Sequence, residues 1–202
     1  LDYLALQFEK DGCSLKKLIR LMVTSRVYQS TSQNIPENNT KDPQNLLLAN
    51  MRLKRMEGET IRDSMLEISG GLDNAMFGKS VPVYLSSFQE GRGRPQSGPV
   101  DGAGRKSIYL GVRRNFLSSF LLAFDAPIPF STVGRRSVSN VPAQALIMMN
   151  DPFVHQQAKL WAAKVIKTVP DSDKRLESMF IQAFSRKPQP LEIKHCLEHL
   201  EN

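Results

Sequence analysis

Apolar residues recur every three or four positions through most of this chain, which is the spacing of amphipathic helices. Near the N-terminus, one apolar face comprises Leu1, Leu4, Ala5 and Phe8. A second helix is predicted to begin after Ser14, whose hydroxyl can accept a hydrogen bond from a free backbone N–H at the helix start. Its apolar face comprises Leu15, Leu18, Ile19, Met22 and Val23, and its polar face carries Lys16, Lys17 and Arg20.

The next segments are shorter and less regular. Ser30–Asp42 is polar and contains a proline, which predicts a loop. Pro43 favours a short helix that runs to Asn50. Arg55–Ser69 is predicted to be an amphipathic helix that ends at Gly70–Gly71. Its inward face comprises Ile61, Met65 and Ile68.

The last ninety or so residues return to helical spacing. Leu117–Phe124 is apolar and is ended by Asp125–Pro127, because the residue before a proline avoids the helical region. Val141–Met149 is predicted to be a buried segment. Three further amphipathic helices are predicted, and their starts are indicated by residues that favour helix N-termini: Asp151–Pro152, Asp171 and Pro190.

Residues 71–107 break the helical pattern. Five of the twelve glycines lie between Gly91 and Gly104, and we expect residues 86–106 to form a flexible basic loop. Ser107–Val112 favours β structure and can pair with Val81–Leu85 in a short hairpin. The fold class is therefore predicted to be mainly α: a single domain over residues 1–202, with about eight helices packed as an irregular bundle around this long Gly/Pro-rich loop.

Composition adds limits to this picture. The chain has 202 residues, of which 41% are hydrophobic and 23% are charged, as in ordinary globular domains. Two cysteines cannot form a disulfide scaffold or a four-thiolate metal site. No apolar run reaches the roughly 18 residues that a membrane-spanning helix needs.

Charge is concentrated in one segment. The formal net charge is +7, and residues 91–136 contain eight Lys and Arg against two Asp. Such a segment favours anionic partners, and aromatic residues interleave with it too sparsely to favour single-stranded nucleic acid. The arginines predicted to bind an anion are Arg92, Arg94, Arg105, Arg113, Arg114, Arg135 and Arg136.

A group of charges on the predicted helix at 55–69 admits two interpretations. Glu57, Glu59, Arg62 and Asp63 are spaced for ion pairs within one helix, or for pairs with Arg113–Arg114 and Arg135–Arg136. Guanidinium groups fork onto carboxylates and also clamp anions, so both interpretations stay open. A rival hypothesis, glycoside hydrolysis, needs paired carboxylates, for which the candidates are Glu57, Glu59, Asp63 and Asp125.

The histidines and cysteines give weaker indications. His195 and His199 lie four residues apart with Glu192 one turn earlier, a spacing that can place two imidazoles on a metal ion. A solvated helix face is favoured instead, because the sequence shows no second acidic or His cluster and this face lies opposite the apolar stripe. His155 has no activated nucleophile motif beside it, so no catalytic residue is predicted. Cys13 and Cys196 can form a disulfide if the end helices pack together.

Several ordered motifs resemble one family. They include Ser107–Asn115, Phe124–Pro127, Arg135–Ser137, Pro142–Leu146 and Asn150–Val154, and they extend over nearly the whole chain. Together they resemble the planctomycete-specific domain of unknown function found at the C-terminal end of large exported cytochrome c-associated proteins. The chain departs from that family at Ile128, where a second aspartate is frequent, and at Gly134, where a cysteine is frequent.

The resemblance implies an exported multidomain protein of the periplasm or cell envelope. Haem would then be carried only by other domains, because this chain lacks Cys-x-x-Cys-His; we expect no cofactor in it. We therefore expect a non-catalytic C-terminal binding domain whose basic region meets another domain of the same protein or an acidic or sulfated polysaccharide. The alternatives are part of a polysaccharide hydrolase and a purely structural spacer or dimerisation domain.

Overall fold

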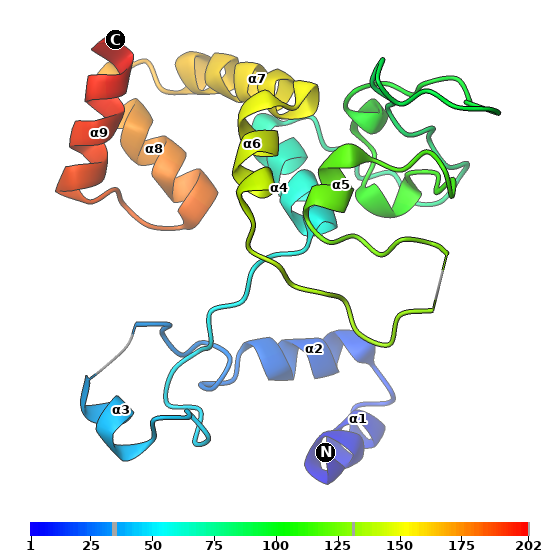
Figure 1. Cartoon of the computed structure of the whole chain (residues 1–202). Helices are drawn as coiled ribbons and strands as arrows, with labels where there is room; N and C mark the ends of the chain where they lie inside the picture. Colours follow the sequence, from blue (N-terminus) through cyan, green and yellow to red (C-terminus); the bar gives the residue numbers. More distant parts are fainter. Residues whose placement is uncertain (34–35, 131, 202) are drawn as a thin grey trace. The chain divides into compact units, whose positions relative to one another are not determined.

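A computed structural model describes residues 1–33, 36–130 and 132–201 of the chain. Nine α-helices and two short 3-10 helices make up the regular structure of these residues, which confirms the mainly α class (Figure 1). They divide into two compact units, residues 1–55 and 56–202. No helix in these ranges combines the length and the apolar character needed to cross a membrane. The single domain and the flexible loop stay predictions.

The N-terminal unit contains α1 (Asp2–Lys10), α2 (Leu15–Val23) and α3 (Pro36–Lys41). The helix start at Ser14 is confirmed, because its hydroxyl oxygen accepts a hydrogen bond from the backbone N–H of Lys17 at 3.5 Å. α1 packs against α2. Among the described residues of this unit, none is fully buried.

Two expectations for this unit are wrong. The segment Ser30–Asp42 is not a loop throughout, because Pro36 begins α3; residues 34–35 of it lie outside the described residues. The helix expected from Pro43 to Asn50 is absent from the structure. Instead, the carboxylate of Asp42 accepts hydrogen bonds from the backbone N–H groups of Leu46 and Leu47, at 2.9 and 2.7 Å. A side chain that takes these amides replaces the helical bonds they would make.

In the C-terminal unit, α4 (Gly58–Ser69) lies at the centre (Figure 1). It packs against α7 (Pro152–Thr168), α5 (Ser119–Ala123) and the 3-10 helix η2 (Ser107–Tyr109). The remaining helices are η1 (Gly102–Gly104), α6 (Pro142–Asn150), α8 (Ser172–Phe184) and α9 (Pro190–Glu201).

The core of this unit joins α4, α5 and α7 through Leu66, Phe120, Phe124 and Phe153. The Phe120 ring lies 5.1 Å from that of Phe124 and 5.6 Å from that of Phe153, in tilted and edge-on arrangements that aromatic pairs prefer. Fully burying a side chain of this size contributes about 1.5–3 kcal/mol, so this cluster is the main source of stability here.

The helix ends follow the sequence signals. Gly70 closes α4 in the left-handed conformation, with φ +84°. The carboxylate of Asp151 accepts a hydrogen bond from the N–H of Phe153 at 2.8 Å, and Asp171 does the same for Asp173 at 3.1 Å. The starts predicted for α7 and α8 are therefore confirmed.

The expected inward face of α4 is confirmed in part, because Ile61 and Met65 pack against the core; its fully buried residues, however, include Leu66 and Arg62, and Ile68 is half-buried. Two other details of the expected packing are wrong. In Val141–Met149 only Gln144 is buried. The expected hairpin is replaced by one parallel bridge between Val81 and Leu110, and a parallel pair cannot be a hairpin.

Replacement of Leu66 by alanine tests the position of the core. Leu66 has no exposed surface, so the substitution should lower the free energy of unfolding by about 3 kcal/mol through lost burial and a cavity. Leu160→Ala on α7 is the matched control, because Leu160 is largely exposed and its loss should cost less than about 1 kcal/mol. Urea titrations measure both, and equal losses would contradict the core described above.

Candidate functional site

Arg62 holds a loop onto α4. Its side chain is only 5% exposed, and its guanidinium donates hydrogen bonds to three groups of residues 101–107. Nη1 donates to the carbonyl oxygen of Arg105 at 3.0 Å and to Oγ of Ser107 at 3.1 Å, while Nη2 donates to the carbonyl oxygen of Asp101 at 2.7 Å. The carbonyl oxygen of Asp101 also accepts a hydrogen bond from the N–H of Gly104 at 3.3 Å, whereas that of Arg105 accepts its hydrogen bond from Arg62.

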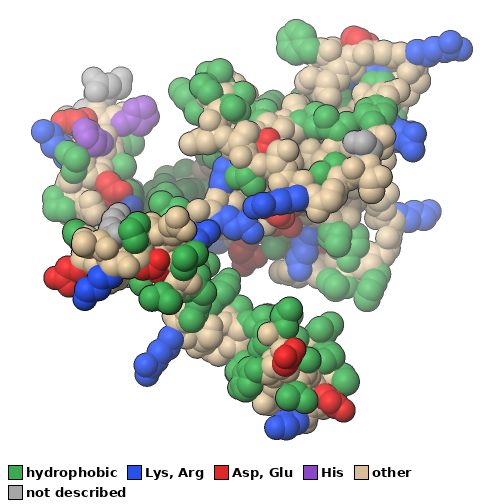
Figure 2. All heavy atoms as spheres, turned by 60° about the horizontal axis from the view of Figure 1, so that its bottom comes forward, with side chains coloured by type: hydrophobic (Ala, Val, Ile, Leu, Met, Phe, Trp, Pro, Cys, Tyr) green, Lys and Arg blue, Asp and Glu red, His purple; other side chains and the backbone are tan. Residues whose placement is uncertain are grey.

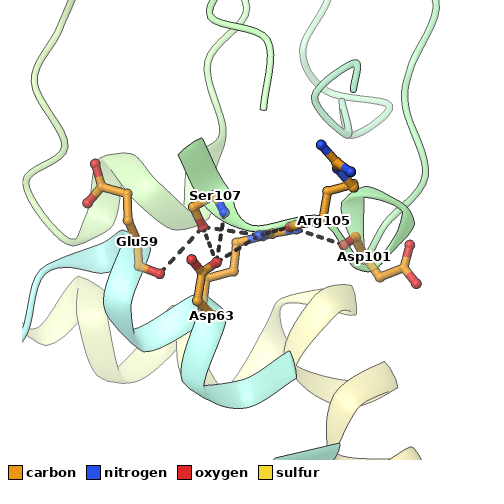
Figure 3. A network of polar contacts seen from close by, with 6 residues as sticks. Glu59, Asp63, Asp101, Arg105 and Ser107 are labelled. Carbon is orange, nitrogen blue, oxygen red and sulfur yellow. Dashed lines mark hydrogen bonds and ion pairs between the residues drawn. The ribbon is translucent and has the colours of Figure 1, made fainter. Parts of the chain in front are cut away.

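Asp63 completes this network from the next position of α4. Its Oδ1 accepts hydrogen bonds from the backbone N–H of Ser107 at 2.8 Å and from Oγ of Ser107 at 2.7 Å (Figure 3). The same oxygen lies 3.3 Å from Nη1 of Arg62. Burial lowers the pKa of Arg62, and the charge of Asp63 opposes that shift. The pair thus keeps a buried cation compensated, as a buried charge requires.

Two glycines allow the loop to approach this closely. Gly102 and Gly104 have φ of +62° and +69°, in the left-handed region that favours glycine. A Cβ at Gly102 would collide with Nη2 of Arg62, and one at Gly104 would collide with the carbonyl oxygen of Gly71. The Gly-rich sequence is therefore required at this end of the segment by contacts with α4 and the residues after it.

A cavity of about 830 Å³ opens beside this network. Its charged lining comprises four carboxylates and one guanidinium: Glu57, Glu59, Asp63, Glu67 and Arg136. The guanidinium of Arg136 donates two parallel hydrogen bonds to the Glu59 carboxylate, at 2.8 and 2.9 Å, and Glu57 lies 3.5 Å away. The hydrogen bonds from Arg136 hold the pKa of Glu59 below its ordinary value.

These contacts show which ion pairs the acidic residues make. Glu57 and Glu59 pair with Arg136, one of the predicted partners, whereas the pair within the helix joins the adjacent residues Arg62 and Asp63 and not residues three or four apart. A glycosidic general acid needs a raised pKa, which is the opposite of the shift at Glu59. Asp125 accepts hydrogen bonds from the N–H and Oγ of Ser139, at 2.7 and 2.9 Å.

Three of the seven arginines predicted to bind an anion are engaged within the fold. Arg94 donates to the carbonyl oxygens of Gln89 and Ser86, at 2.9 and 3.2 Å. Arg105 lies 3.6 Å from the carboxylate of Asp73, and its guanidinium is 4.0 Å from the centre of the Tyr109 ring. Arg136 is the partner of Glu59. Arg94 and Arg105 therefore bind acceptors within the fold, and Arg136 forms part of the cavity wall.

The other four arginines, Arg92, Arg113, Arg114 and Arg135, are exposed, and none has a hydrogen-bond or ion-pair partner for its side chain in the part of the chain that the structure describes. We call these four residues the arginine patch.

Two of the loops that carry the patch meet. The N–H of Phe116 donates to the carbonyl oxygen of Arg113 at 3.0 Å, and the Phe116 ring lies against Gly91, the neighbour of Arg92. Val112 and Arg136, which are the neighbours of Arg113 and Arg135, both line the cavity. The loop of Arg92 is therefore in contact with that of Arg113 and Arg114, and Arg135 lies on a third loop beside the cavity wall.

The histidines and cysteines form no comparable site. Arg186 holds Glu192 through two hydrogen bonds, at 2.7 and 2.8 Å, and lowers its pKa to about 2. Nδ1 of His195 lies 3.5 Å from Glu198. Within residues 1–33, 36–130 and 132–201, no three His, Cys, Asp or Glu side chains are close enough to hold a metal ion. Cys13 is exposed, Cys196 is half-buried, and both are free thiols.

Comparison with known families gives a match over nearly the whole chain. The model of a family described as PSD1, a protein of unknown function (DUF1553), matches residues 1–200. The expected membership of a domain family of unknown function is thereby confirmed, while the planctomycete and cytochrome c context stays a prediction. No curated protein and no solved structure matches the chain.

Replacement of Arg136 by glutamine tests the ion pair at the cavity wall. Without the guanidinium, the pKa of Glu59 should rise toward its ordinary value of 4.5, which carboxyl NMR titration measures directly. The lowered pKa of wild type means that the pair stabilises the fold above about pH 4.5 and that this contribution fades as the pH falls through the lowered value. Arg135→Gln removes an adjacent arginine without a partner and should leave the pKa of Glu59 unchanged; a shift of equal size in both variants would refute the pairing.

Proposed function

The chain belongs to the PSD1 family (DUF1553), and we propose that it is a non-catalytic binding domain that holds a polyanion at the arginine patch. The observation that carries the proposal is the lack of any described side-chain partner for Arg92, Arg113, Arg114 and Arg135, together with the contact through Phe116 between the loops that carry the first three. Exposed cations without counterions in the protein attract a polyanion, which supplies the missing opposite charges.

The chemistry of the patch selects the ligand class. Guanidinium groups bind carboxylates and sulfates through two parallel hydrogen bonds, which a lysine patch could not provide. The four arginines are exposed on loops, so they suit a chain with repeated anionic groups better than one small anion. An acidic or sulfated polysaccharide, or an acidic surface of another domain of the same protein, has these properties.

The setting follows from the resemblance to exported cytochrome c-associated proteins. An exported protein of the cell envelope meets acidic polysaccharide, so the proposed location and the proposed ligand agree. Any haem would belong to other domains of that protein. The engaged carboxylate of Glu59 supports a binding role over hydrolysis, because its hydrogen bonds from Arg136 lower its pKa and favour the ionised form.

Other surface cations provide the comparison that the proposal needs. Lys and Arg side chains project from the surface at several separate points (Figure 2). Lys159 and Lys167 on α7 are exposed and make no side-chain ion pair in the described part of the chain. Their joint removal changes the net charge as much as removal of two patch arginines does.

Heparin serves as the probe polyanion. The protein should be retained at low salt and elute as salt rises, and Arg113→Ala/Arg114→Ala should weaken affinity roughly fivefold, because each exposed charge contact contributes about 0.2–1 kcal/mol. The control Lys159→Ala/Lys167→Ala should elute close to wild type. Calorimetry or the salt at elution measures the difference.

Two outcomes would refute the patch. Wild type that passes through at low salt would exclude polyanion binding. Equal losses in the arginine and lysine variants would show a response to net charge alone, without a localised site.

A further inference from the structure

The N-terminal unit has a surface that the proposed function does not use. None of its described residues is fully buried, although apolar side chains are frequent in it. It also carries nine Lys and Arg against five Asp and Glu. An exposed surface that is both apolar and cationic indicates an interaction site, and its partner should be apolar and anionic.

α2 concentrates both properties. Leu15, Ile19, Met22 and Val23 recur at helical spacing and form one exposed stripe; the first two are 65% and 53% exposed. Hydrophobic side chains reach the surface widely in this protein (Figure 2), but this stripe is continuous over two turns of one helix.

The charges of α2 have one sign. Lys16, Lys17 and Arg20 are exposed on its other face, the helix contains no acidic residue, and none of the three cations has an ion-pair partner among the described residues. α1, by contrast, carries Asp2 and Glu9 beside Lys10. The complement of α2 is therefore a surface that is both apolar and anionic.

We infer that α2 docks on an anionic lipid surface, with its apolar stripe at the boundary of the acyl chains and its three cations at the headgroups. A basic amphipathic helix lies in the interface in this way, since both buried apolar area and attraction to anionic lipid contribute to binding.

The distribution of exposed residues favours lipid over a protein groove. Beyond α2, this unit also exposes the apolar side chains of Tyr3 and Leu6 on α1 and of Leu46–Leu48. A fluid bilayer surface covers such an irregular set without matching shape, whereas a protein groove needs a defined row of anchors. This surface is independent of the arginine patch, which belongs to the other unit.

Cosedimentation of the full chain with phosphatidylcholine vesicles, with and without phosphatidylglycerol, tests the inference. Wild type should bind the vesicles that contain phosphatidylglycerol and bind pure phosphatidylcholine much less. Ile19→Ser/Met22→Ser keeps every charge and should weaken binding roughly tenfold, because two large side chains no longer enter the interface. Both residues are exposed, so the fold should persist, which circular dichroism checks.

One control replaces exposed apolar residues outside the stripe, and a dye reports whether α2 itself enters the lipid surface. Leu160→Ser/Ile166→Ser alters two exposed apolar residues of α7 and should bind as wild type does. A polarity-sensitive dye on Cys13, next to the N-cap of α2, should shift to the blue on anionic vesicles, in a Cys196→Ser background that leaves one thiol.

Three results would overturn the inference. They are no binding to anionic vesicles, unchanged binding by Ile19→Ser/Met22→Ser, or a loss confined to Arg113→Ala/Arg114→Ala. The last result would assign headgroup binding to the arginine patch and would leave the polyanion proposal standing. If instead the protein binds anionic vesicles but not heparin, the polyanion proposal is removed and the α2 docking surface stands.

Discussion

The C-terminal unit depends on one buried cation, the guanidinium of Arg62. It projects from the central helix α4 and binds the carbonyl oxygens of Asp101 and Arg105, which lie almost forty residues further along the chain. Hydrogen bonds from a charged donor are stronger than neutral ones, and their loss would leave the carbonyl oxygen of Arg105 without this partner. Asp63 balances the charge and takes the N–H of Ser107, so two adjacent residues of one helix fix both ends of the turn.

This anchor fixes the segment of the chain that leads to Arg113 and Arg114. Residues 108–112 follow directly from Ser107, and their path is held by the exchange of backbone hydrogen bonds between Val81 and residues 109 and 111. Arg113 and Arg114 come next in the chain. The path from Arg62 to Arg113 and Arg114 is thus short: the guanidinium binds the loop, the loop leads to the bridge, and the two exposed arginines follow the bridge.

Local sequence signals predicted what local physics controls. Ser14, Asp151 and Asp171 cap helices because their side chains reach backbone amides two or three residues away, and Gly70 ends α4 because it alone adopts a left-handed φ without strain. The predictions failed where a contact spans the chain. Periodicity placed Ile61 and Met65 correctly against the core, but Arg62 was assigned only to ion pairs and its burial was missed, because no local pattern shows that a loop carbonyl will arrive at its guanidinium.

The candidate site shows the same division. Basic density identified residues 91–136, but only tertiary structure separates Arg94, Arg105 and Arg136, which have acceptors within the fold, from the four that do not. Ser107 was not singled out in the sequence, although it lies at the centre of the network. The available signal was the pair of glycines Gly102 and Gly104. Glycines so close together indicate a backbone that adopts positive φ or approaches another element closely, and both glycines have positive φ here.

Hydrogen exchange in Arg62→Met tests the anchor most directly, because methionine has a similar length and no donor. The account predicts that the Ser107 amide and its neighbours through Gly111 exchange at least about a hundredfold faster, while the amides at the middle of α7 keep their protection. Unchanged protection of the Ser107 amide, or equal loss of protection throughout the unit, would contradict the claim that this guanidinium holds the loop in place.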